Sequence, residues 1–299
     1  MKFLNTIFIF TILLIFTNCS STNTVTIDDL KNSIEEQFKL MDGDFAYAFL
    51  NLTNLNELIR INVNEKFHAA STMKVPVMIE VFKQAANDKF NLMDSIEVKN
   101  EFRSIVDGSV YSMDINDDSG EGLYKMINKK LTINDLMYEM ITVSSNLATN
   151  ILVELVDAKK VTSNMKAIGA NNMIVLRGVE DIKAYEEGLS NSTTAEDLMI
   201  IMQSIANGTA GNSTDCQQMI HILKAQHFND MIPKYYPENV AVAHKTGSIT
   251  GVHHDSGIIY LPDGRSFVLV ILSKNLQDFD KATDAMAKIS KETLDFMTQ

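Results

Sequence analysis

Three short motifs, far apart in the chain, carry side chains that could attack an amide or lactam carbonyl. The first holds Ser71 and Lys74, the second is Ser144-Ser145-Asn146, and the third is Lys245-Thr246-Gly247-Ser248. A serine hydroxyl is a weak nucleophile until a neighbouring base takes its proton. Together the motifs supply a nucleophile, groups that relay a proton and a cation beside a predicted strand. Each motif alone is common, so it is their occurrence in this order that is informative.

The Ser71 and Lys74 side chains share one face if their segment is helical, because residues three apart are neighbours on a helix. Lysine acts as a base only when burial and nearby cations lower its pKa. The apolar neighbours Met73 and Val75 indicate burial, and Lys245 would add the second cation. We also expect a helix N-terminus at Ser71, with its N–H facing the developing oxyanion. Taken alone, the motif could equally be a surface lysine beside an N-capping serine.

Ser144-Ser145-Asn146 separates two helical patterns at 131–141 and 147–156. A loop there would present Ser144 and Asn146 on the same side. Ser144 would then pass a proton to the leaving nitrogen, and Asn146 would hold an amide carbonyl of the substrate. A simple helix cap is the alternative interpretation of this tripeptide.

The third motif follows a strand-like segment at 239–243. Gly247 leaves the strand edge open, so a ligand can pair with its backbone. Lys245 and Thr246 offer donors to a substrate carboxylate. The N–H of Ser248 is the expected partner of the Ser71 N–H in an oxyanion hole. A glycine-marked bulge would give the same tripeptide.

Strand patterns at both ends of the chain enclose a largely helical middle, about 72–230, and so predict how these motifs are positioned. We expect helices at 29–41 and 278–297, and strands at 45–52, 58–63, 240–247, 256–261 and 266–273. One antiparallel sheet would be built from the two termini, with the terminal helices on one face and a helical lobe on the other. The active site would lie in the cleft between the sheet edge and that lobe.

The first 18 residues have the pattern of a targeting signal. Lys2 precedes an apolar run at 3–16 that is short for a membrane span. Cys19 follows at once, as at a bacterial lipoprotein processing site, which makes it a candidate for lipid attachment to a membrane. Ordinary cleavage is the alternative, and residues 19–28 form at most a short tether. Either route exports the protein, and we expect it in the periplasm.

Composition excludes some functions and partners. A net charge of −12 and a pI near 4.9 argue against a nucleic-acid partner. Only Cys19 and Cys216 are present, so we expect no intrachain disulfide once Cys19 is processed. The acidic stretch 107–122 has the pattern of a surface loop and lacks the spacing of an EF-hand. We therefore expect no metal, no cofactor and a monomer that binds a small-molecule substrate.

With these motifs in this order, the chain resembles the class A β-lactamases and related penicillin-recognising serine hydrolases over nearly all of residues 29–297. The resemblance implies an α/β sandwich, about 29–70 and 235–299, plus an all-α lobe, about 71–234. It also implies a serine acylated by a β-lactam carbonyl. The roles it implies are Ser71 as nucleophile, Lys74 as base, Ser144 as relay, and Lys245-Thr246 as carboxylate anchor.

Hydrolytic members of that family add a loop with a glutamate that activates the deacylating water. Here Arg177 marks the expected start of the loop, with an R-x-x-E spacing instead of R-x-E, and Asn191 replaces the acid that normally closes its neck. Glu180 is the candidate base. The alternative interpretation is a solvated acidic loop without a catalytic role. The rivals of Glu180 are other acids of the same segment, namely Asp181, Glu186 and Glu187.

A second departure from the family concerns the substrate carboxylate. Many class A enzymes place an arginine on the strand after K-T-G, whereas this chain has His253-His254-Asp255. We expect one of these two histidines, with His254 as the candidate, to assist carboxylate binding, which would make that contact sensitive to pH. A metal site is disfavoured because adjacent residues on a strand face opposite ways.

We therefore expect an exported serine hydrolase that opens β-lactams through an acyl-enzyme. A D-alanyl-D-alanine carboxypeptidase or another cell-wall amide or ester hydrolase is favoured instead if Glu180 does not face the acyl carbonyl. A non-hydrolytic penicillin-binding sensor is favoured if no carboxylate reaches the site.

Overall fold

A computed structural model describes residues 24–299 of the chain. The predicted targeting segment and Cys19 lie outside the described residues. From residue 24 onward, no helix combines the length and the apolar character needed to cross a membrane.

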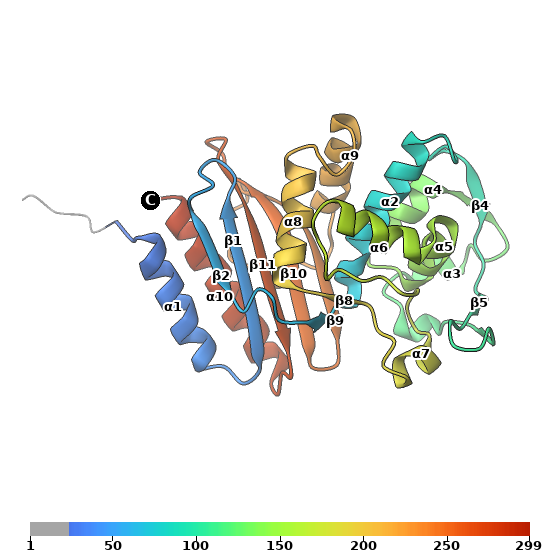
Figure 1. Ribbon diagram of the computed structural model, residues 1–299, viewed down its shortest axis with the longest axis horizontal. Helices are drawn as coiled ribbons and strands as arrows, with labels where there is room; N and C mark the ends of the chain where they lie inside the picture. The colour runs from blue at the N-terminus through green and yellow to red at the C-terminus, as the bar shows by residue number, and fades with distance from the viewer. Residues whose placement is uncertain (1–23) are drawn as a thin grey trace, which may run out of the picture.

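A five-stranded antiparallel sheet forms the centre of one half of the molecule (Figure 1). Its strands run in the spatial order β2 (Leu58–Ile61), β1 (Asp44–Asn51), β11 (Ser266–Lys274), β10 (Val252–Tyr260) and β9 (Ala241–Ile249). The two ends of the chain meet where β1 pairs with β11, in a register from Asp44 opposite Lys274 to Asn51 opposite Phe267. The predicted sheet built from both termini is confirmed.

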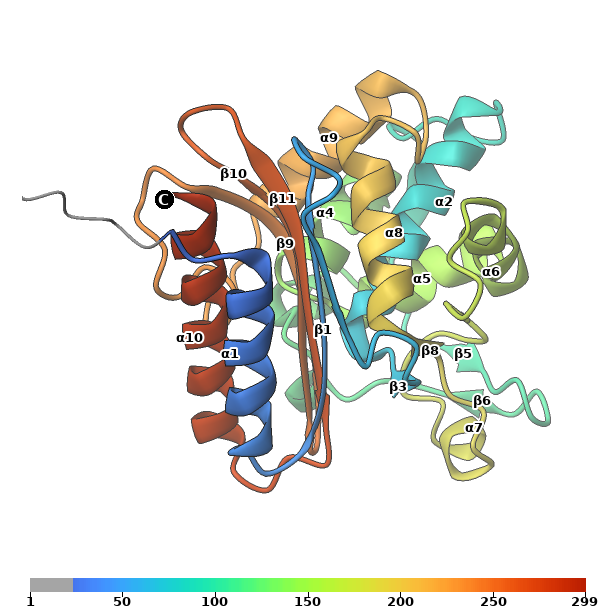
Figure 2. The same ribbon diagram turned by 60° about the vertical axis from the view of Figure 1, so that its left-hand side comes forward.

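Helices cover both faces of the sheet (Figure 2). Because successive side chains on a strand point to opposite faces, each strand contributes side chains to both cores. On β1, Phe45, Tyr47 and Phe49 belong to the core beneath the terminal helices α1 (Ile27–Lys39) and α10 (Phe279–Met297). Ala46, Ala48 and Leu50 belong to the larger core on the other side, where α8 (Ala195–Ala206) contacts β1, β10 and β11.

The remaining helices form a lobe around α2 (Lys74–Ala86), which is buried on nearly all sides (Figure 1). A helix that is apolar all round is a core helix, which explains why the segment after Ser71 carries so few polar residues. It contacts α4 (Ile133–Thr142), α5 (Asn146–Val156), α6 (Ala158–Ala167) and α9 (Ser213–Lys224), and α3 (Glu121–Tyr124) and α7 (Ile182–Glu186) complete the lobe. The predicted α/β sandwich with an all-α lobe is therefore the observed fold.

Short two-stranded ladders and 3₁₀ turns complete the architecture. Two-stranded ladders join β3 (Phe67–His68) to β8 (Ser192–Thr193), β4 (Ser95–Glu97) to β7 (Lys130–Thr132), and β5 (Phe102–Arg103) to β6 (Val110–Tyr111). The 3₁₀ helices are η1 (Ala70–Met73) and η2 (Ile115–Asp117).

The largest error in a predicted strand boundary is four residues. The strand expected to begin at residue 256 is β10, and it begins at Val252. The polar residues His253, His254 and Asp255 masked its start, but all three are buried and continue the ladder with β9.

Candidate active site

Ser71 lies in the 3₁₀ turn η1, between the short strand β3 and helix α2. The predicted helix N-terminus at Ser71 is therefore a tighter turn, and α2 itself begins at Lys74. Ala70 adopts a left-handed φ of +44°, and the Thr72 hydroxyl donates to the Ala69 carbonyl over 2.6 Å. These local features turn the chain sharply after β3, and Ser71 lies at the cleft.

Gly247 explains how β9 comes so close to this turn. A Cβ atom at Gly247 would lie 3.0 Å from both the Ser71 and Thr72 backbone nitrogens. Only glycine therefore lets the strand edge pack against the turn without displacement. The third motif thus lies directly beside the first, as the sequence predicted.

Lys74 is fully buried next to the second motif. Its Nζ donates to Ser144 O over 2.7 Å, to Ser144 Oγ over 3.1 Å and to Asn146 Oδ1 over 2.9 Å. Burial lowers the pKa of Lys74 to about 7, although the charges of Asp118 and Glu180 oppose this shift. A substantial fraction of the neutral amine, the form that can accept a proton, is thus present near neutral pH.

Ser144 receives hydrogen bonds from two lysines. Lys245 Nζ donates to Ser144 Oγ over 3.1 Å and to Thr246 O over 2.9 Å. Lys245 is also fully buried, and its pKa lies well below the usual range because of burial and the nearby Lys74 charge. Ser144 has a left-handed φ of +58° in the loop that contacts the two lysine side chains. The arrangement suits a hydroxyl that passes protons between neighbours.

Asn146 connects Lys74 to Glu180. While its Oδ1 accepts from Lys74, its Nδ2 donates to Glu180 Oε1 over 2.7 Å. Glu180 is half-buried, and burial raises the pKa of its carboxyl group, partly offset by the hydrogen bond from Asn146. A raised pKa makes a carboxylate a better general base.

The segment that carries Glu180 is held by a buried amide that the sequence analysis missed. Asn150 Oδ1 accepts from Val179 N over 2.6 Å, and its Nδ2 donates to Val179 O over 3.0 Å. A Cβ at Gly178 would lie 2.2 Å from Asn150 Oδ1, so the contact requires glycine. A polar residue within the apolar helix α5, one turn after Asn146, was the available signal.

Asn191 closes the neck of the same loop with its amide. Its Oδ1 accepts from Leu176 N over 2.8 Å, and its Nδ2 donates to Arg177 O over 3.0 Å. The Arg177 guanidinium donates instead to the carbonyls of Leu189 and Gly178. The amide of Asn191 therefore closes the neck through backbone groups, where the family pattern has an acid.

The three other acids considered as the deacylation base do not contact Asn146. Asp181 is buried, caps α7 by accepting from Ala184 N over 3.2 Å, and accepts from Ile105 N over 2.9 Å. Glu186 and Glu187 are exposed. Of these four acids, Glu180 is the one joined to Lys74 through Asn146.

A cavity of about 400 Å³ brings part of the predicted set together. Among the predicted residues, it is lined by Ser71, Asn146, Glu180 and Ser248. Its wall also includes exposed apolar side chains at Ile182, Tyr185 and Ile249. The cavity wall does not include Lys74, Ser144, Lys245 or Thr246. Lys74 is connected to the wall through its hydrogen bond to Asn146, and Lys245 is connected to Lys74 through Ser144.

The prediction that His254 binds a substrate carboxylate is wrong. His254 is fully buried, and both of its ring nitrogens are occupied by the protein. Its Nδ1 accepts from Ser273 N over 3.2 Å, and its Nε2 donates to His68 O over 2.9 Å. Burial lowers its pKa to about 4. His254 therefore supports the sheet and the segment before Ser71 and does not face the cavity.

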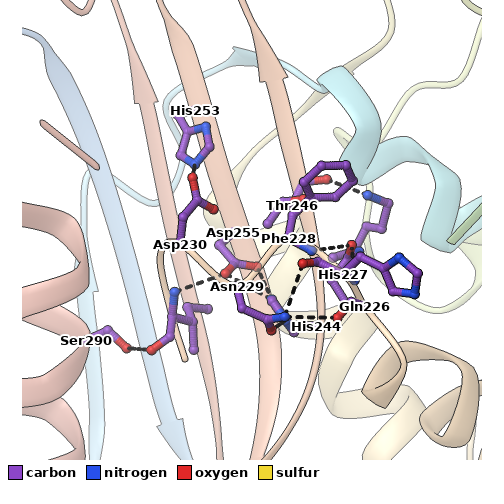
Figure 3. A network of polar contacts seen from close by, with 12 residues as sticks. Gln226, His227, Phe228, Asn229, Asp230, His244, Thr246, His253, Asp255 and Ser290 are labelled. Atoms are coloured by element: carbon purple, nitrogen blue, oxygen red, sulfur yellow. Dashed lines mark hydrogen bonds and ion pairs between the residues drawn. The ribbon is translucent and has the colours of Figure 1, made fainter. Parts of the chain in front are cut away.

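The other two residues of this triplet also have structural partners (Figure 3). Asp255 accepts from His244 Nδ1 at 3.0 Å and from Ile232 N at 3.1 Å, and His244 Nε2 lies 3.2 Å from Asn229 Oδ1. His253 Nε2 lies 3.7 Å from Asp230. The buried pair of His244 and Asp255 joins β9 to β10 on the face opposite Lys245.

Comparison with known proteins agrees with this geometry. A family model described as the beta-lactamase enzyme family matches residues 28–297. Beta-lactamase Toho-1 of Escherichia coli is 24% identical over 280 residues, which cover 90% of this chain and 91% of that protein. Beta-lactamase VEB-1 of Pseudomonas aeruginosa is 24% identical over 294 residues, covering 90% of each.

Solved structures give the same result for the fold. A beta-lactamase from Sphaerobacter thermophilus superposes with a TM-score of 0.79 at 25% identity and covers 92% of this chain and 98% of that one. PBP-A superposes with a TM-score of 0.76 at 20% identity, covering 91% and 97%.

Proposed function

This chain belongs to the beta-lactamase enzyme family, and from that premise we propose that it opens β-lactam rings through an ester formed on Ser71. The chain is a serine hydrolase that acts on cyclic amides. The observation that carries the proposal is the continuous set of hydrogen bonds from Lys245 through Ser144, Lys74 and Asn146 to Glu180. The network joins two buried lysines, Ser144 and a carboxylate beside the cavity that Ser71 lines.

In the first step, Ser71 Oγ attacks the lactam carbonyl carbon and its proton passes to the neutral amine of Lys74. The N–H groups of Ser71 and Ser248 stabilise the oxyanion. When the carbon–nitrogen bond breaks, the leaving nitrogen takes a proton from Ser144 Oγ, and Lys74 Nζ replaces it. The 3.1 Å bond between Lys74 and Ser144 supports this transfer.

In the second step, Glu180 takes a proton from a water molecule that attacks the ester carbonyl. The carbon–oxygen bond to Ser71 breaks, the Ser71 oxygen takes up the proton that Glu180 removed from the water, and the ring-opened product leaves. Glu180 and Ser71 line the same cavity, which favours hydrolysis over a stable acyl-enzyme. Lys245 and Thr246 remain our candidates for the contact with the substrate carboxylate, since His254 does not serve it.

Intact-protein mass spectrometry after mixing the purified protein with a penicillin tests the function directly. A transient adduct together with ring-opened product is the expected result. A persistent adduct without product would point to a penicillin-binding protein, and turnover of D-alanyl-D-alanine peptides alone would point to a carboxypeptidase. Absence of any adduct or product would contradict the proposal.

We also propose that the protein is exported to the periplasm and that Cys19 is its point of lipid attachment. The support is the apolar run at 3–16 followed by that cysteine. Metabolic labelling with a palmitate analogue, compared between the protein and a Cys19→Ala variant, tests the attachment. Equal labelling of both would contradict it.

A further inference from the structure

The carboxylate of Asp118 is buried directly behind the Ser144-Ser145-Asn146 loop, although it lies on a separate segment of the chain. Only 5% of the residue is exposed. Its Oδ1 accepts from the backbone nitrogens of Gly120 and Asn146, at 2.8 and 2.9 Å. Its Oδ2 accepts from Leu147 N at 2.8 Å, Tyr124 OH at 3.1 Å and Ser145 Oγ at 3.4 Å.

Two of these donors are the first backbone N–H groups of α5, at Asn146 and Leu147. The first N–H groups of a helix have no partner within the helix, and they favour a negative charge. By accepting from both, Asp118 fixes the direction in which α5 begins. Ser144, two residues before α5 begins, has a left-handed φ of +58°, which costs energy for a residue with a side chain unless neighbours hold it.

Packing joins the two segments as closely as the hydrogen bonds do. A Cβ at Gly120 would lie 2.5 Å from Ser145 Cβ and 2.6 Å from Ser145 Oγ. The φ of Gly120 is −95°, which any residue adopts. Glycine is therefore required here for the close approach alone. Residues 118–120 thus pack tightly against the Ser144-Ser145-Asn146 loop and hold it in place.

The negative charge of Asp118 also acts on Lys74. Among the charges that oppose the effect of burial on the pKa of Lys74, that of Asp118 is the largest, followed by Glu180. On the other side, Lys74 faces the ammonium of Lys245 through Ser144. Removal of the Asp118 charge should therefore lower the pKa of Lys74.

The S-D-N form of this motif carries an aspartate between the serine and the asparagine, where this chain has Ser145. We propose that Asp118, supplied from a distant loop, is the positioning residue that holds Ser144 and Asn146 in the geometry needed for acylation. This inference rests on the proposed function, because acylation of Ser71 is its readout. Asp118 acts through Asn146 and Ser144 and does not itself line the cavity.

An Asp118→Asn variant tests the carboxylate. The amide nitrogen of asparagine would face N–H donors that now point at an oxygen, so the loop should shift. A misplacement of about 1 Å can reduce the rate of a catalysed step about a hundredfold, and we expect the acylation rate constant to fall by about ten- to a hundredfold. Asp114→Asn is the matched control, because Asp114 is exposed on the same loop.

The pH profile separates positioning from general damage to the fold. In Asp118→Asn the midpoint of the acid limb of acylation should move to lower pH, because Lys74 loses its strongest stabilising negative charge. Asp114→Asn should leave the midpoint in place. An unchanged midpoint together with an acylation rate constant within about twofold of wild type would overturn the proposal.

A second pair of variants tests the packing without changing any charge. Gly120→Ala would push against Ser145, whereas a Cβ at Gly122 meets nothing within 4 Å. We expect Gly120→Ala to slow acylation at least about tenfold, and Gly122→Ala to match wild type. If Asp118→Asn does not fold, this pair decides, and equal rates for the two alanine variants would contradict the proposal.

Amide hydrogen exchange tests the role of Asp118 without relying on acylation of Ser71. If the wild-type protein forms no adduct with any β-lactam, the proposed function fails while the support of the loop can still be measured. The amides of Gly120, Asn146 and Leu147 should then exchange at least about tenfold faster in Asp118→Asn than in wild type. Equal exchange at these amides would overturn the role of Asp118.

Discussion

The side-chain amide of Asn146 donates to Glu180 Oε1 over 2.7 Å. Because the same amide accepts from Lys74 over 2.9 Å, it connects the base proposed for acylation with the base proposed for deacylation. Each donor and acceptor of this amide is thus matched to the charge that it faces. The orientation of Glu180 relative to Ser71 is therefore set by the second motif as well as by the loop that carries it.

Glu180→Gln should separate the two steps of the reaction. Glutamine keeps the size of the side chain and cannot take a proton from water, so acylation should continue while the ester accumulates. General-base catalysis contributes about 10²–10⁴-fold, and we expect the hydrolysis rate constant of the acyl-enzyme to fall within that range. Mass spectrometry of the protein after mixing with a penicillin measures the lifetime of the adduct.

Glu187→Gln is the control for this experiment, since Glu187 is exposed just beyond α7. It should turn over like wild type. Normal turnover in Glu180→Gln would show that another carboxylate activates the water. Asp181 would then be the next residue to change, because it also lines the cavity.

The rate of acylation should depend on pH through Lys74. Burial lowers its pKa to about 7, and only the neutral amine accepts the Ser71 proton. Below that pH the amine is charged and acylation is slow, and above it the rate constant reaches a plateau. Stopped-flow measurement of acylation between pH 5.5 and 9 should therefore give a rising curve with its midpoint near 7. A curve that is flat over this range would contradict the role of Lys74.

Gly247→Ala should slow acylation without unfolding the protein. The new Cβ would lie 3.0 Å from the Ser71 and Thr72 nitrogens, so β9 must move away from η1. That movement separates the Ser71 and Ser248 N–H groups, whose loss of alignment should cost about 10²–10³-fold if they form the oxyanion hole. Single-turnover kinetics and a thermal unfolding curve check the two parts of the prediction. Wild-type acylation in a folded variant would contradict this arrangement.

Local patterns in the sequence were sufficient for the framework. The short apolar runs of β1 and β11 and the longer apolar run of α2 predict which segments form the sheet and which lie in the core. The three motifs likewise predict Ser71, Lys74, Ser144 and Lys245 as neighbours. Their relative positions follow from the family resemblance as much as from spacing.

Contacts between distant segments were not predictable in the same way. The carboxylate of Asp118 meets Asn146 across 28 positions, and no periodicity links the two. The error at His254 has a related cause. Alternation on a strand indicates that His253 and His254 face opposite ways, but both faces of β10 are covered. A polar residue there can be buried in either direction.

His254→Gln should change the pH dependence of stability. The pKa of His254 falls from its ordinary 6.5 to about 4 on folding. Above pH 6.5 the ring is neutral in both states, and its contribution to stability is fully present. As pH falls from 6.5 toward 4, the unfolded chain binds a proton that the folded protein does not, so the free energy of unfolding decreases. For this ring the decrease is on the order of 3 kcal/mol.

Urea unfolding between pH 4 and 7 measures this difference. Glutamine does not titrate, and its amide can still accept from Ser273 N and donate to His68 O, so the variant should show a smaller loss of stability on acidification. Burial lowers the pKa of His68 and His253 as well, and these rings should leave a residual slope. His221→Gln, at an exposed position on α9, should follow the wild-type curve. Identical curves for His254→Gln and wild type would mean that His254 is accessible to protons, as a ligand-binding histidine would be.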